Sequence, residues 1–189
     1  SPSRRASRRR RAAVAIRLRV LTVTDIHRHA AHYAELAEAV NRHRPHVVAF
    51  VGDFLHGGND NMGRLSPEEC AVAIGRLACR DVVFVRGNHE DHAWLPFASA
   101  WQRTRRRLHA LHGEGYTYEA FTMVGFPCFL GLEEPFLGGR LPLPMDPKEW
   151  LPNVLRSWGP ASRTLWLMHE PPAGTPLSEP DTPVAGNLE

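Results

Sequence analysis

Only three cysteines occur in this chain of 189 residues, and none forms a Cys-x-x-Cys pair. An odd number at wide spacing argues against a disulfide framework. We place Cys70 and Cys79 on one predicted helix, where nine residues of separation put them on opposite faces and prevent a bridge between them. Reduced cysteines are typical of the cytoplasm, which is the compartment that we predict.

Long apolar runs are also missing. The longest strand-like run, Val47–Val51, is far shorter than the roughly 18–20 apolar residues that a membrane-spanning helix needs. The composition, with 43% hydrophobic and 23% charged residues, is that of a globular domain and excludes a disordered or collagen-like chain. We therefore predict one domain with no membrane partner.

Lysine is nearly absent, since Lys148 is the only one among 23 basic residues. Eight arginines fall within residues 1–19, which contain no acid, so the rest of the chain has 15 basic and 20 acidic side chains. We predict a disordered Arg-rich tail over residues 1–15 and a domain over residues 16–189. The tail is either a solvated leader, which we favour, or a tether that attracts nucleic acid through counterion release.

Apolar spacing along the chain changes repeatedly between the period of a strand and that of a helix. The predicted strands are Ile16–Thr24, Val47–Val51, Asp81–Val85, the pair Tyr116–Glu119 and Ala120–Phe126, and Thr164–Met168. The predicted helices are Ala31–Arg42, Ser66–Ala78, Trp94–Leu108 and Pro147–Trp158. Such alternation is typical of an α/β layered fold.

Polar side chains follow four of the predicted strands at the point where each strand ends. In chain order they are Asp25 and His27, Asp53, Asn88 and His89, and His169. Ligands of α/β proteins bind beyond the carboxyl ends of strands, so we expect these side chains to meet in one crevice. Capping of the next helix explains any single motif equally well, but it does not explain four such motifs in order. Their oxygen and imidazole donors suit Mn, Fe, Zn or Ni ions.

The ordered motifs Asp25-x-His27, Gly52-Asp53, Gly87-Asn88-His89-Glu90 and His169 resemble those of calcineurin-like metallophosphoesterases, over about residues 18–172. The resemblance implies a four-layer α/β/β/α sandwich. It also implies an enzyme that hydrolyses a phosphomonoester or phosphodiester through two divalent metal ions and a hydroxide that bridges them.

The same resemblance assigns roles to single residues. Asp25 and His27 would bind the first metal ion, Asp53 would bridge both ions, and Asn88 and His169 would bind the second. His89 would be the general acid for the leaving oxygen or would steady the phosphoryl group, so Asn88 and His89 are also the expected substrate-binding residues.

Two departures from the family pattern limit what the resemblance implies. The closing Gly-His-x-His motif is missing, so we expect an incomplete fold at the C-terminus, a natural protein that continues past residue 189, and weak or no activity of this chain. The alternative is a noncatalytic module that binds metal or nucleic acid. Residues 52–58 also lack the Asp and Arg of the protein-phosphatase motif Gly-Asp-x-x-Asp-Arg-Gly, which favours a general phosphoesterase. The sequence indicates neither the substrate nor the oligomeric state.

Overall fold

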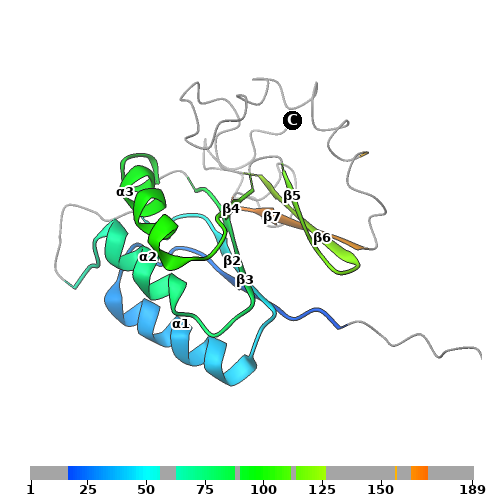
Figure 1. Ribbon diagram of the computed structural model, residues 1–189, viewed down its shortest axis with the longest axis horizontal. Coiled ribbons are helices and arrows are strands. Elements are labelled where there is room, and N and C mark those ends of the chain that lie inside the picture. Colours follow the sequence, from blue (N-terminus) through cyan, green and yellow to red (C-terminus); the bar gives the residue numbers. More distant parts are fainter. Residues whose placement is uncertain are drawn as a thin grey trace, which may run out of the picture.

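Two β-sheets pack against each other in the computed structural model, which describes residues 17–55, 63–87, 90–111, 114–126, 156 and 163–169 (Figure 1). The first sheet is parallel throughout, with strands β1 (Val20–Val23), β2 (Val47–Val51), β3 (Asp81–Val85) and β4 (His109–Ala110) in that order. In the second sheet, β6 (Phe121–Phe126) lies between an antiparallel β5 (Gly115–Tyr118) and a parallel β7 (Thr164–Met168).

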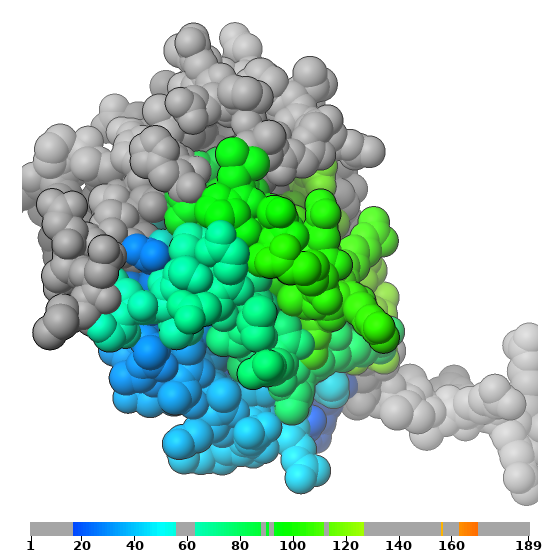
Figure 2. Space-filling view, turned by 60° about the vertical axis from the view of Figure 1, so that its left-hand side comes forward, coloured from blue at the N-terminus to red at the C-terminus, as the bar shows by residue number. Residues whose placement is uncertain are grey.

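Three helices cover one face of the first sheet. They are α1 (Ala30–His43), α2 (Pro67–Gly75) and α3 (Asp91–Trp101). Figure 2 shows their side chains as a continuous surface, with α1 in blue, α2 in blue-green and α3 in green. Beneath them lies an apolar core to which β2 contributes Val48 and Phe50 and β3 contributes Val82 and Phe84.

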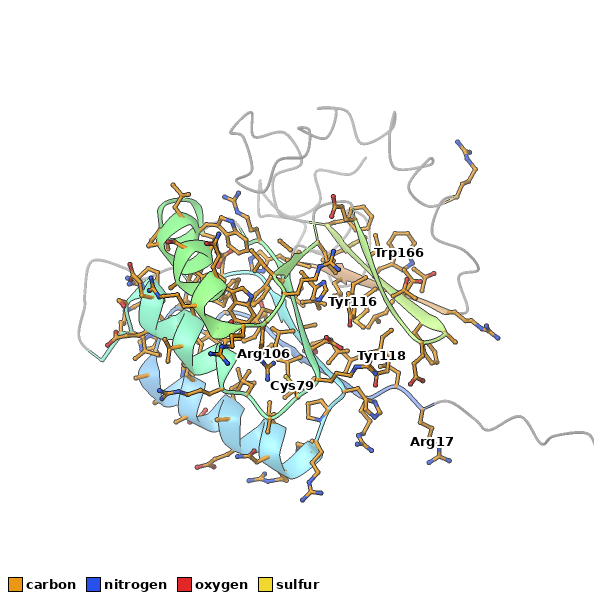
Figure 3. All side chains as sticks on the ribbon, viewed as in Figure 1. Arg17, Cys79, Arg106, Tyr116, Tyr118 and Trp166 are labelled. Carbon is orange, nitrogen blue, oxygen red and sulfur yellow. The ribbon has the colours of Figure 1, made fainter. Side chains whose placement is uncertain are left out.

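The alternate residues of the same strands face the second sheet. Val47 and Ala49 of β2 pack there with Met123 of β6 and Leu167 of β7 in a second apolar core. Tyr118 of β5 is buried in this core, on the side of β5 that faces the first sheet (Figure 3). Because β2 is apolar on both faces, its five residues read as an unbroken hydrophobic run in the sequence.

This arrangement confirms the predicted α/β class. One helical layer and two sheets account for three of the four layers of an α/β/β/α sandwich, and any fourth layer would come from residues outside the described ranges. In the part of the chain that the structure describes, no helix is long and apolar enough to cross a membrane.

The predicted central strands agree closely with the structure, whereas several element ends do not. β2, β3 and β7 have the predicted bounds, β5 is shifted by one residue at both ends, and β6 starts one residue later than predicted. The first strand is shorter than predicted, and β4 was not predicted because two residues show no periodicity. The predicted helix Pro147–Trp158 lies outside the described residues except for Arg156, which is helical.

Two predicted helices were too long. The helix predicted to reach Leu108 ends at Trp101 and is followed by the short 3₁₀ helix Gln102–Thr104. The Thr104 hydroxyl donates to the Trp101 carbonyl (2.7 Å), and Arg105 has a left-handed backbone with φ 60°, which stops the helix.

The other overlong helix is α2, which ends at Gly75, where the backbone closely approaches the Thr104 side chain. Cys79 therefore lies beyond the helix and not on it. Its carbonyl accepts a hydrogen bond from Arg106 (3.1 Å), and Figure 3 shows the two residues side by side. Cys70 and Cys79 are free thiols, as predicted, but the two residues do not share one helix.

Candidate metal centre

Four polar residues meet where strands of both sheets end. Asp25 and His27 follow β1, Asp53 follows β2, and His169 follows β7. Because the first sheet is parallel, the carboxyl ends of β1 and β2 lie at the same edge, and β7 of the second sheet brings His169 to that edge from far along the chain. The structure thus brings these four side chains close together.

The loops after β1 and β2 are joined by backbone hydrogen bonds that continue past the strands. The amides of Asp25, His27 and Arg28 donate to the carbonyls of Gly52 (3.2 Å), Asp53 (3.0 Å) and Phe54 (3.2 Å). Asp25, His27 and Asp53 have left-handed backbones, with φ of 56°, 49° and 51°. Such conformations cost non-glycine residues about 1–3 kcal/mol each and persist where neighbouring contacts hold them, often at functional sites.

Asp25, His27 and Asp53 each offer a ligand atom to one point in space. These atoms lie within 4.8 Å of one another. The Nε2 atom of His27 is 3.6 Å from Oδ1 of Asp25, and Asp53 is only 3% exposed. Two carboxylates and an imidazole are suitable ligands for Mn, Fe, Zn or Ni, so the residues fit the metal that the motifs imply.

His169 completes the group from the opposite side. Its Nε2 is 3.5 Å from Oδ2 of Asp53, and its Nδ1 is 2.9 Å from the Val51 carbonyl oxygen. The ring packs directly on Gly52, where any side chain would collide with it. Burial opposes protonation, but the bonds to Asp53 and Val51 and the charges of Asp53 and Asp25 together raise the pKa of His169 to about 9.

The remaining predicted site residues, Asn88 and His89, lie outside the described residues. Gly87, immediately before them, packs against Asp53 so closely that a Cβ atom there would overlap the Asp53 carboxylate. The structure therefore brings the start of the Gly-Asn-His-Glu motif to the centre.

Two further residues of the centre were not predicted. The Thr24 hydroxyl donates to Oδ2 of Asp25 (2.6 Å) and lies 2.8 Å from the Val51 carbonyl oxygen. Glu90, which the sequence shows only as the last residue of a motif, is completely buried. Its position directly after the other motif residues is the one signal that the sequence offers, whereas Thr24 offers none.

Comparisons with known proteins agree with this geometry. The family model for calcineurin-like phosphoesterases matches residues 18–181. No curated protein matches the chain. One solved crystal structure is similar with a TM-score of 0.58 and 13% identity, over 90% of this chain and 77% of that chain, which shows a shared fold. The structure of YfcE, a phosphoesterase from E. coli, has a TM-score of 0.40 and 16% identity over 56% of this chain and 55% of its own.

Proposed function

Since the chain belongs to the calcineurin-like phosphoesterase family, we propose that it is a metal-dependent enzyme that hydrolyses a phosphate ester. The observation that carries the proposal is the convergence of Asp25, His27 and Asp53 within 4.8 Å, with His169 beside Asp53. Helix capping does not account for the group, because the N-cap residues of α1, α2 and α3 are His29, Ser66 and Glu90.

In this proposal Asp25 and His27 would hold one divalent ion, Asn88 and His169 would hold a second, and Asp53 would be a ligand of both. Mn, Fe, Zn and Ni all accept this set of oxygen and imidazole donors. When bound, a pair of such ions neutralises phosphate charge and provides a nucleophile at neutral pH.

The protein's own contribution is to orient these ligands. The Thr24 hydroxyl fixes the Asp25 carboxylate, and the Val51 carbonyl fixes the ring of His169, so that the other ring nitrogen faces Asp53. Contacts of this kind typically raise metal affinity by a factor of about 10–100. Asn88 and His89 would contact the phosphoryl group, and His89 would donate a proton to the leaving ester oxygen because imidazole titrates near neutral pH.

The test is Mn²⁺-dependent hydrolysis of p-nitrophenyl phosphate and bis(p-nitrophenyl) phosphate, which also separates monoesterase from diesterase activity. Asp53→Asn should abolish hydrolysis and weaken Mn²⁺ binding, because it removes the charge of the shared ligand. Asp81→Asn is the matched control, since Asp81 is the first residue of β3 and lies at the end of the strands opposite to the centre. Asp81→Asn should hydrolyse both esters as the wild type does.

His89→Ala separates the enzyme from a noncatalytic module. Loss of a general acid should lower turnover about 10²–10⁴-fold while Mn²⁺ stays bound. Wild-type protein that binds Mn²⁺ but hydrolyses neither ester would contradict the enzyme and favour the binding module.

We also propose a cytoplasmic location, which the free thiols of Cys70 and Cys79 support.

The alternative function concerns the Arg-rich tail, which would tether the protein to nucleic acid. Residues 1–15, the predicted tail, lie outside the described residues. Deletion of residues 1–19 should remove salt-dependent binding of DNA or RNA if the tail is a tether, and equal binding without the tail would exclude that role.

A further inference from the structure

Glu90 is a buried carboxylate that the proposed chemistry does not use. Among the described residues, only Asp53 and Glu90 are charged side chains in the buried class, and Glu90 is 0% exposed. No arginine or lysine of the described residues pairs with it. A buried carboxylate without a cation is costly unless hydrogen bonds satisfy it, so its contacts indicate what it does.

Helix capping is the ordinary explanation for an acid at this position, and the structure excludes it. Glu90 is the N-cap residue of α3, where carboxylates commonly accept hydrogen bonds from the first helical amides. Its side chain makes no such bond. The carboxylate instead points away from its own helix.

The Glu90 carboxylate accepts hydrogen bonds from two loops, the one that carries Asp53 and the one that begins with Gly87. The Leu55 amide, in the loop after β2, donates to Oε1 (3.2 Å), and the Gly87 amide, in the loop after β3, donates to Oε2 (2.5 Å). One carboxylate thus ties together the backbones of two separate loops.

These bonds fix the residue whose position matters most to the centre. Asp53 has a left-handed backbone with φ 51°, and Glu90 holds this loop through the amide of Leu55, two residues further along the chain. The bond to Gly87 keeps the Gly87 Cα against the Asp53 carboxylate. Both the backbone and the side chain of Asp53 are therefore constrained by Glu90.

We propose that Glu90 is a positioning residue that holds Asp53 in its metal-binding orientation by joining the loops after β2 and β3. The inference rests on the proposed function, because Asp53 is a ligand only if the centre binds metal. Glu90 touches neither substrate nor metal in this role.

Glu90→Gln tests the proposal because it keeps the shape of the side chain but replaces one acceptor oxygen with an amide donor. We expect Mn²⁺ affinity, measured by titration calorimetry, to fall about tenfold or more, with an unchanged far-UV circular dichroism spectrum. Hydrogen exchange should become faster at the amides of Leu55 and Gly87 but not in α2.

Ile74→Val is the matched control for a general loss of stability. Ile74 is fully buried in the helix-side core, on α2, away from the centre. Its truncation should leave Mn²⁺ affinity within twofold of the wild type. An equal loss of affinity in both variants would overturn the positioning role, and so would unchanged Mn²⁺ binding by Glu90→Gln.

The two proposals fail in different ways. If the wild type binds no Mn²⁺, the proposed function fails, and amide exchange alone then decides whether Glu90 holds the loops. Faster exchange at Leu55 and Gly87 but not in α2 supports the loop constraint, and unchanged exchange overturns it. If Glu90→Gln does not fold, Glu90→Asp takes its place, and weakened Mn²⁺ binding supports the role whereas unchanged binding overturns it.

Discussion

Gly52 determines where an imidazole can lie in the centre. It has φ 84°, and a Cβ atom built on it would overlap the ring of His169. Gly63 has a similar φ of 70°, but nothing lies within 4 Å of the place that its Cβ would occupy. The two glycines therefore share the backbone requirement and differ only in their surroundings.

Gly52→Ala should displace His169 and weaken Mn²⁺ binding, whereas Gly63→Ala should not. Both variants should lose about 1 kcal/mol of stability or more, because alanine is strained at positive φ. Titration calorimetry gives the affinities, and urea unfolding gives the stability. Equal Mn²⁺ affinity in the two variants would show that the space above Gly52 has no role in binding.

For single residues, the sequence predicts the polar residues that follow strands, but it misses residues whose role depends on tertiary contacts. Asp25, His27, Asp53 and His169 were predicted because a polar residue after a buried strand is a local signal. Thr24 and Glu90 were not, because some of their contacts lie more than 25 positions away along the chain: Thr24 contacts Val51, and Glu90 contacts Leu55. No local pattern records such a contact.

Among the elements, α2 has the most complete start signal. The Glu69 amide donates to the Ser66 hydroxyl (3.1 Å), the Ser66 amide donates to the Glu69 carboxylate (2.7 Å), and Pro67 occupies the first turn. The sequence predicts a helix from Ser66, and in the structure Ser66 is its N-cap residue.

Ser66→Ala should lower the free energy of unfolding by about 1 kcal/mol, since it leaves the Glu69 amide without its capping acceptor. Urea denaturation measures the loss. Ser66→Thr keeps the hydroxyl and should restore most of it. Mn²⁺ affinity should not change in either variant, because the cap makes no contact with the centre.

Helix ends were harder to predict than helix starts. Thr104 and Arg105 stop the helical segment after α3 through a side-chain hydrogen bond and a left-handed backbone, and neither residue type is a strong stop signal. α1 is the contrasting case. Pro45 disfavours helical backbone at Arg44, which adopts φ 45°, and the helix ends within one residue of its predicted end.

At the scale of the whole molecule, stability should fall at alkaline pH because of two buried, weakly acidic side chains of the helix-side core. Burial, the largest influence, raises the pKa of Cys70 from 9.0 to about 11 and holds that of Tyr33 well above 10.0. Both groups ionise at lower pH in the unfolded chain than in the folded one. Their contribution to stability is therefore complete below about pH 9 and is lost as pH rises through the folded pKa values.

We expect the free energy of unfolding to decrease between about pH 9 and 11, by up to about 1.4 kcal/mol per pH unit for each group. Urea unfolding at several pH values measures the slope. Cys70→Ala should make it shallower. Lysine contributes little to this slope, because the chain has one lysine and 22 arginines, and arginines stay charged in this range. A slope that Cys70→Ala leaves unchanged would contradict this account.

His169 reaches the centre from a part of the chain that is made long after the rest, which gives the centre an order of assembly. A ribosome adds about 5–20 residues per second, so on the order of ten seconds separate the synthesis of Asp53 from that of His169. Throughout that interval the nascent chain holds Asp25, His27 and Asp53 without the imidazole of β7. The acidic half of the centre is thus made first, and the second sheet must dock before the other half exists.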